Sequence, residues 1–329
     1  MSELHRFVFD GAPVRGMLVR LDDGWREMLQ RRGDAAYPMP VQALLGEMTA
    51  AAVLMQANIK FSGALILQVF GDGPVKVVVA EAKPDLSLRA TASVTGVLPA
   101  DARLPAMVNV HGKGRCAITL EPAERLPGQQ PYQGVVPLFD DQRQPLTKLS
   151  DVLQHYMLQS EQLDTTLVLA ADDQVAAGLL IQRLPTKGEA NLAANAEAAA
   201  QGISLEDQIG LNEDYNRISI LASSLTRDEL LGLDVETILR RLFWEEKLLR
   251  FAPQQGMLGP KFRCTCSRER VAGMIRGLGA QEAEEILAER GDIEVGCDFC
   301  GKQYRFDAVD AAQIFTAGTD QVPGSPTVQ

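Results

Sequence analysis

Four of the five cysteines of this chain lie in its last quarter and form two short motifs. Cys264 and Cys266 make a Cys-x-Cys motif, and Cys297 and Cys300 make a Cys-x-x-Cys motif. Four thiolates that converge form a tetrahedral site for zinc. Four thiols that can leave the metal as two short disulfides also form a sensor of oxidants. The residue types therefore predict a metal site, and whether that site is structural or redox-active decides the function.

The sequence around the cysteines predicts the backbone that holds them. Cys297-Asp-Phe-Cys300-Gly301 is typical of a zinc knuckle, in which backbone N–H groups point at sulfur and the glycine takes a left-handed conformation. Residues 293–295 and 303–306 alternate polar and apolar side chains, which indicates two flanking strands. Ser267 is a good N-cap for a helix, and a second helix is expected over 280–290. A section this short needs a metal to fold.

Basic side chains surround both motifs, although the chain as a whole is acidic. They are Lys261, Arg263, Arg268, Arg270, Lys302 and Arg305. Positive charge near a thiol stabilises its thiolate and keeps the sulfur nucleophilic. The alternative interpretation is that these residues are ordinary surface charges.

The four-cysteine site has four interpretations: a structural zinc site, an iron–sulfur cluster, a nucleic-acid-binding zinc ribbon and a redox switch. Charge disfavours the ribbon, because residues 264–329 carry six basic and eleven acidic side chains. The colour of the protein would reveal an iron–sulfur cluster. The Cys-x-Cys spacing favours the redox switch, since most structural knuckles use a wider spacing.

Overall composition excludes several classes of protein. At 329 residues the chain is long enough for about two domains. Its net charge of −11 is unsuited to nucleic acids and to anionic membrane surfaces. The N-terminus lacks the pattern of a signal peptide, and the most apolar stretch, 41–57, carries Glu47 and is too short to span a membrane. A cytoplasmic location is therefore expected, where clustered cysteines indicate metal or redox chemistry.

Residues 1–185 are expected to form an α+β domain. Pro38 and Pro40 precede an apolar helix, and Ser150 is expected to cap another. Glycine- and aspartate-containing turns separate apolar runs, which predicts hairpins. The expected helices are 22–33, 41–58 and 150–162, and the expected strands are 14–21, 64–70, 75–81, 107–111, 115–120, 165–171 and 175–184.

Residues 186–263 differ in character and are predicted to be a metastable helical linker. Residues 190–200 have high helix propensity but almost no apolar side chain to bury, so this helix should be marginal alone. Residues 189–230 hold two basic and eight acidic side chains. Further helices are expected over 204–211, 215–224 and 234–250. The zinc-binding section then covers 264–317, and a disordered tail covers 318–329.

The rest of the sequence gives only weak indications of catalytic, metal-binding or nucleotide-binding residues. The three histidines, His5, His111 and His155, form no metal-binding pair, and Cys116 is expected to be a small core residue. Ser160 beside Glu161 is expected to be a polar helix end. The chain has no Gly-x-x-x-x-Gly-Lys-Ser/Thr loop and therefore no ATP site of that type. Without a catalytic constellation, we expect the protein not to be an enzyme.

Several segments together resemble the redox-regulated 33-kilodalton heat-shock protein family of holdase chaperones. Phe262-Arg-Cys264-Thr-Cys266-Ser267-Arg-Glu-Arg270 and Glu294-Val-Gly-Cys297-Asp-Phe-Cys300 are similar to its redox switch. Tyr156-Met-Leu-Gln-Ser160-Glu-Gln162 and Ala177-Gly178-Leu-Leu-Ile-Gln182-Arg-Leu-Pro185 are similar to two upstream signatures, with mild departures at Met157 and Ala177. The resemblance covers most of the chain.

The resemblance implies a domain-exchanged homodimer built on the N-terminal domain, which is followed by a helical linker and a C-terminal zinc domain. It implies that Cys264, Cys266, Cys297 and Cys300 bind one zinc ion in the inactive, reduced protein. Oxidation then forms Cys264–Cys266 and Cys297–Cys300 disulfides, releases zinc, unfolds the switch and linker, and exposes apolar surface that holds unfolding client proteins without ATP. The alternative is an enzyme or adaptor with a purely structural four-cysteine zinc domain.

Overall fold

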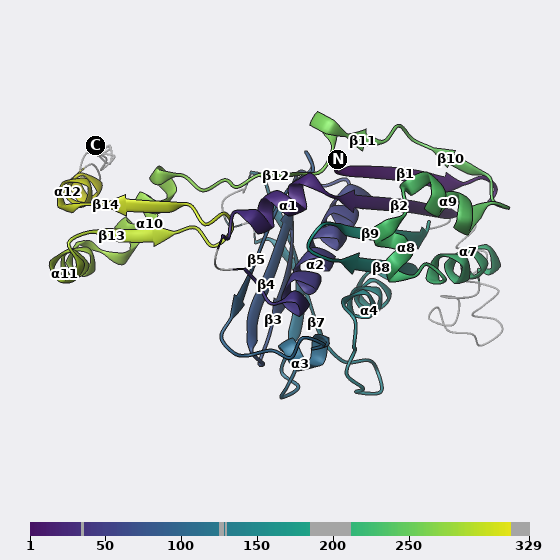
Figure 1. Cartoon of the computed structure of the whole chain (residues 1–329), viewed down its shortest axis with the longest axis horizontal. Coiled ribbons are helices and arrows are strands. Elements are labelled where there is room, and N and C mark those ends of the chain that lie inside the picture. The colour runs from purple at the N-terminus through teal and green to yellow at the C-terminus, as the bar shows by residue number, and fades with distance from the viewer. Residues whose placement is uncertain (34–35, 125–127, 129, 185–211, 317–329) are drawn as a thin grey trace, which may run out of the picture. The chain divides into compact units, whose positions relative to one another are not determined.

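The computed structural model describes residues 1–33, 36–124, 128, 130–184 and 212–316. It divides into two compact units, Met1–Arg263 and Cys264–Gln329, each of which is described by itself (Figure 1). The helices expected over 190–200 and 204–211 and the expected disordered tail lie outside the described residues.

The first unit contains two sheets, which gives it a mixed α/β fold. The first sheet has the order β10-β1-β2-β9-β8, and a further strand, β11, pairs with β1. Its strands are β1 (Glu3–Phe9), β2 (Val14–Leu21), β8 (Thr165–Ala171), β9 (Ala176–Arg183), β10 (Leu248–Arg250) and β11 (Gln254–Gln255). The second has the order β12-β5-β4-β3-β6-β7. Its strands are β3 (Gly63–Phe70), β4 (Val75–Ala82), β5 (Ser87–Val94), β6 (Arg115–Pro122), β7 (Tyr132–Pro137) and β12 (Lys261–Phe262).

Helix α2 (Met39–Asn58) lies between the two sheets and packs against strands of both (Figure 1). Because both sides of the helix are covered, apolar residues occupy nearly its whole circumference, and Leu45, Met48 and Leu54 are completely buried. Gly46 lets the helix approach the neighbouring strands, since a Cβ there would overlap the Cβ of Ala171. The apolar run that the sequence predicted to be a core helix is thus the centre of the first unit.

Three helices cover the other face of the first sheet: α7 (Glu213–Ser223), α8 (Arg227–Gly232) and α9 (Val235–Phe243). The strands alternate between the two cores, so that Leu180 of β9 belongs to the core around α2, whereas Leu179 belongs to the core beneath these helices. The rings of Phe9 and Phe243 meet edge to face at a centroid distance of 5.0 Å. The described part of the segment expected to be a linker therefore lies within the first compact unit, and its metastability stays a prediction.

Three expectations about individual elements were wrong. Residues 107–111 do not form a strand, because a short helix, α3 (Leu104–Val108), has Pro105 in its first turn and includes the start of this segment. The helix expected over 234–250 ends at Phe243, and the next apolar residues extend the edge of β1 as strand β10. Ser150 does not cap α4 (Leu149–Glu161), which begins one residue earlier and has Lys148 at its N-cap without a side-chain hydrogen bond. In contrast, the hairpins β3–β4 and β8–β9 are confirmed.

The second unit is small. It contains helices α10 (Arg268–Leu278), α11 (Ala280–Arg290) and α12 (Ala308–Thr316) and the hairpin of β13 (Ile293–Gly296) and β14 (Gln303–Phe306). Its core consists of Val271, Ile275, Ala283, Ile293, Tyr304, Phe306, Ala311 and Ile314. Eight buried side chains are few for an independent domain. Across the described residues of both units, no helix combines the length and apolarity needed to cross a membrane.

We predict that Gly46→Ala destabilises the protein, although alanine favours isolated helices. The added Cβ would overlap that of Ala171 and lie 3.1 Å from Ala176 Cβ, and neither small side chain can move aside. Overpacking should lower the free energy of unfolding by about 1–3 kcal/mol, measured by urea denaturation. The control is Gly232→Ala at the end of α8, where a Cβ meets nothing within 4 Å. Equal urea midpoints for the two variants would contradict this account of helix packing.

Candidate metal centre

Two pieces of backbone bring the four cysteines together. Cys264 and Cys266 lie in the extended segment before α10, which begins where the Ser267 hydroxyl accepts a hydrogen bond of 3.2 Å from the Arg270 N–H. Cys297 and Cys300 lie in the turn between β13 and β14. There the Gly301 N–H donates to the Cys297 carbonyl at 2.8 Å, and Gly301 has a φ of +69°. The predicted N-cap and the predicted left-handed glycine are both confirmed.

The four sulfur atoms form one compact cluster. All four Sγ atoms lie within 4.8 Å of one another. The Cys264 and Cys297 sulfurs are 3.6 Å apart, and those of Cys266 and Cys300 are 3.4 Å apart. A tetrahedral zinc ion with bonds of about 2.3 Å to sulfur requires its ligands to be roughly 3.8 Å apart. The donor set and its spacing therefore fit a four-coordinate metal ion such as zinc.

The thiols of the cluster differ as acids when no metal is bound. Burial raises the pKa of the Cys266 thiol. A 3.1 Å hydrogen bond from the Tyr304 hydroxyl and hydrogen bonds from the neighbouring thiols lower this pKa by more, so that it is about 7. Burial raises the pKa of Cys300 to about 12. Cys266 is therefore more acidic than Cys300, and the Tyr304 hydroxyl stabilises the negative charge of the Cys266 thiolate.

Tyr304 was not singled out as a contact of the cluster by sequence reasoning. It lies on β14, opposite Val295 of β13, and its ring belongs to the core of the second unit. The sequence contained a signal for this contact, because the alternation of polar and apolar residues over 303–306 places this tyrosine on the buried face of the strand. A buried tyrosine needs a partner for its hydroxyl, and the nearest polar atoms are sulfur.

Two basic side chains near the cysteines, those of Arg268 and Arg270, donate hydrogen bonds to backbone carbonyls. Arg268 donates to the Arg305 carbonyl at 2.7 Å and to Asp310, and it lies over the ring of Phe306. Arg270 donates to the Thr265 carbonyl at 2.9 Å, which fixes the residue between the first two cysteines. These contacts support the positions of the ligands, whereas the expected effect of the basic side chains on the thiolates stays a prediction.

The remaining candidates are dispersed through the first unit. Cys116 is buried in β6, and burial raises the pKa of its thiol to about 12, as suits a core residue. His5 contacts Glu3 at 2.7 Å, and His155 lies 3.7 Å from Asp141. Glu161, beside Ser160 at the end of α4, accepts a hydrogen bond of 2.9 Å from Tyr156.

We predict that Tyr304→Phe lowers the zinc affinity of the reduced protein by about tenfold, because outer hydrogen bonds orient metal ligands and tune their charge. Competition with a chromogenic chelator measures the affinity. Tyr132→Phe is the matched control, because its hydroxyl is 3.3 Å from that of Tyr156 in the first unit and has no part in the cluster. Unchanged affinity in Tyr304→Phe would show that this hydrogen bond does not support metal binding.

Comparison with known proteins identifies the family. The family model described as Hsp33 protein matches residues 2–307. The 33 kDa chaperonin of Chromobacterium violaceum is 45% identical over 315 residues, which are 95% of this chain and 94% of that protein. The 33 kDa chaperonin of Methylobacillus flagellatus is 40% identical over 96% of this chain and 94% of that protein.

A solved structure supports the fold. The 33 kDa chaperonin of Thermotoga maritima, called a heat shock protein 33 homolog, superposes with a TM-score of 0.71 at 19% identity. The match covers 97% of this chain and 99% of that one. Together with the matched family model and the sequence relatives, these findings confirm the resemblance found in the cysteine motifs: the chain belongs to the Hsp33 family.

Proposed function

We propose that this protein is a redox-regulated, ATP-independent holdase that prevents unfolding proteins from aggregating. The observation that carries the proposal is the cluster of four sulfurs within 4.8 Å of one another in a unit with very few buried side chains. Membership in a family whose members are named chaperonins supports the chaperone activity.

Cys264, Cys266, Cys297 and Cys300 would hold one zinc ion per chain. Zinc bound by four thiolates supplies no redox chemistry of its own but links the Cys-x-Cys arm to the knuckle. The apparent binding free energy of such sites is about 10–16 kcal/mol. This exceeds the total stability of many domains, about 5–15 kcal/mol. We therefore expect the second unit to stay folded only while its thiolates bind the metal.

Peroxide is the proposed oxidant. Formation of a disulfide from two thiolates transfers two electrons to one peroxide molecule, whose O–O bond breaks, and two protons convert the products to water. Two peroxide molecules thus oxidise the four thiolates to Cys264–Cys266 and Cys297–Cys300 disulfides. Disulfide sulfurs are poor metal ligands, because the thiolate is the binding form. The metal site is then lost, and the second unit unfolds.

Unfolding of the cysteine unit would release the segment that precedes it. Helices α7, α8 and α9 bury apolar side chains such as Ile218, Leu239 and Phe243 against the first sheet. If this segment detaches, both its apolar side chains and the sheet face become available to unfolding client proteins. We further propose that the protein is a cytoplasmic homodimer and does not act as an enzyme.

The second candidate function is an enzyme or adaptor whose zinc site is purely structural. The contacts of Arg268 and Arg270 with local backbone favour it to some degree, because they suit a rigid domain. The two functions differ in the expected consequence of oxidation: a structural site gives only loss of function, whereas the holdase gains activity.

We predict that hydrogen peroxide with mild heating releases about one zinc ion per chain and creates activity that suppresses aggregation. Reductant with zinc should reverse both changes, since disulfide exchange is reversible. Zinc release is followed with a chromogenic chelator, and chaperone activity by light scattering from a thermally unfolding client. Cys116→Ala is the control and should respond like the wild type, because Cys116 lies outside the cluster. If the reduced and oxidised proteins suppress aggregation equally, the proposal is wrong.

We predict that Cys297→Ser gives a loosened protein that suppresses aggregation without peroxide, because three thiolates hold zinc more weakly than four. Zinc content and light scattering are measured together on the reduced variant. A variant that has lost zinc and is destabilised but has no chaperone activity would favour the structural-zinc alternative.

A further inference from the structure

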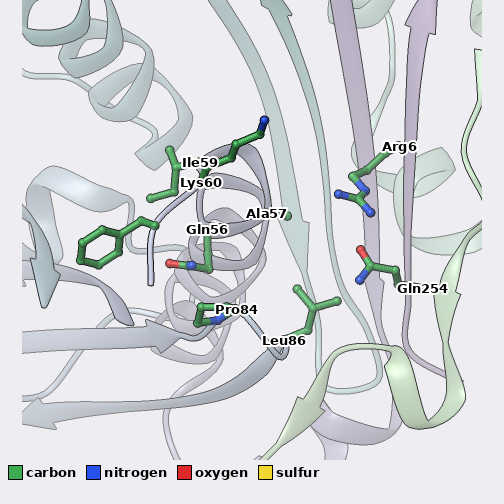
Figure 2. Close-up of a pocket in the computed structure, with 9 residues that line it drawn as sticks. Arg6, Gln56, Ala57, Ile59, Lys60, Pro84, Leu86 and Gln254 are labelled. Atoms are coloured by element: carbon green, nitrogen blue, oxygen red, sulfur yellow. The ribbon is translucent and has the colours of Figure 1, made fainter. Parts of the chain in front are cut away.

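A cavity of about 250 Å³ lies at the C-terminal end of α2, within the first unit (Figure 2). Four separate parts of the chain form its walls: strand β1, the end of α2 with the loop that follows, the turn between β4 and β5, and strand β11. Its lining includes Arg6, Gln56, Lys60, Phe61, Leu86 and Gln254. We call it the α2-end cavity, and the four cysteines have no part in it.

The charge of the α2-end cavity is opposite to that of the chain. Arg6 and Lys60 are the only charged residues of its lining, and no acidic residue is among them. The chain as a whole has a net charge of −11. Figure 2 shows Arg6 and Gln254 on one side of the cavity, with Lys60 and Gln56 on the other. Among the described residues, neither the Arg6 nor the Lys60 side chain has a hydrogen-bond or ion-pair partner, so both cations are available to an anion.

Gln56 contributes a buried amide to the cavity. Its side chain is only 2% exposed, and its Oε1 atom has no hydrogen-bond partner among the described residues. Burying a polar atom without a partner is unfavourable. Because this oxygen is also closed to solvent, Gln56 forms part of the cavity wall, and Arg6 and Lys60 are the groups that can contact an anion.

Leu86 closes one apolar wall at a conformational cost. It has a φ of +58°, in the left-handed region that leucine rarely adopts, and its side chain is 2% exposed. Its N–H donates to the Lys83 carbonyl at 2.9 Å in the turn between β4 and β5. Glycine would suit this backbone better but would leave the wall open. Together with Phe61, Leu86 gives the cavity an apolar part beside its cationic part.

We propose that the α2-end cavity binds a small organic monocarboxylate with a short branched or aromatic body. Arg6 matches a carboxylate through two parallel N–H donors, and Lys60 adds a point charge. An apolar cavity of roughly 150 Å³ takes one benzene molecule, so about 250 Å³ takes such a ring with its carboxylate. Phosphate fits less well, because it has no apolar body to fill the part of the cavity beside Phe61 and Leu86.

The bound carboxylate would also stabilise the pairing of strand β11 with β1. This strand has two residues and pairs with β1 only through Glu3–Gln255 and Leu4–Gln254. A ligand that contacts Gln254 and Arg6 together joins β11 to β1 and to the end of α2. Segments with few backbone hydrogen bonds open readily, so ligand contacts there should slow amide exchange.

The experiment uses the full-length, reduced, zinc-loaded protein with phenylacetate as the probe. Isothermal titration calorimetry measures its Kd, expected on the order of 1 mM for a ligand of this size. Phenylacetamide has the same shape without the charge and should bind at least about tenfold more weakly. Inorganic phosphate should bind more weakly than phenylacetate. Hydrogen exchange should slow in the peptide that contains Gln254 and Gln255 when phenylacetate is bound.

Two variants test the cationic residues. Arg6→Met should weaken phenylacetate binding by about 10- to 100-fold, because a hydrogen-bonded charge is lost. Lys60→Met should weaken it less, and because Lys60 is exposed in a loop, this variant is expected to fold normally. The matched controls are Arg240→Met and Lys76→Met, which replace exposed cations outside the cavity and should leave the Kd unchanged.

Any of three results would overturn the proposal. They are equal binding of phenylacetate and its amide, equal Kd values for the wild type, Lys60→Met and Arg6→Met, and absence of phenylacetate binding up to about 50 mM. None of these measurements depends on chaperone activity, so the outcome is separate from that of the proposed function.

Discussion

The second unit depends on the convergence of four sulfur atoms. Its core holds eight buried side chains, which is little apolar surface to offset the entropy of ordering three helices and a hairpin. The Cys-x-Cys arm precedes α10, whereas the knuckle lies between β13 and β14, and their sulfurs lie 3.4–3.6 Å apart in two pairs. A bond network that closes this loop can supply more free energy than the core itself. We therefore propose that the chemistry of the thiolates governs whether the unit is folded.

The first unit has a different basis for its stability. Helix α2 is apolar around nearly its whole circumference and lies between two sheets, so its burial does not rely on a metal or on the cysteine unit. Loss of the sulfur cluster should therefore leave this part folded. The helices α7–α9 cover a second core on the outer face of the first sheet, which is the apolar surface whose release the proposed activity requires. In the proposed function, one chain combines a stable first unit with a second unit whose folding depends on the metal.

The sequence predicted most of this arrangement because the relevant signals are local. Cysteine spacing, the Ser267 N-cap and Gly301 act within a few residues, and each is confirmed by the structure. Residues 248–250 were misassigned because their conformation depends on a distant partner, since Leu248 pairs with Phe9 of β1. Residues 107–111 were misassigned although the signal is local, because Pro105 lies in the first turn of α3. The hydrogen bond from Tyr304 to Cys266 was missed because it joins residues far apart in sequence. The α2-end cavity was also missed, since four distant segments form it.

Hydrogen exchange on metal-stripped, reduced protein tests most directly the claim that metal–thiolate bonds hold the second unit together. The comparison is between protein with zinc and the same protein after chelation, with all thiols kept reduced. We expect amides of α10, α11 and α12 to lose their protection on chelation, while the strands around α2 keep theirs. Unchanged protection of α10–α12 in the stripped protein would show that the small core suffices, and it would contradict the account of the cluster as the element that controls folding.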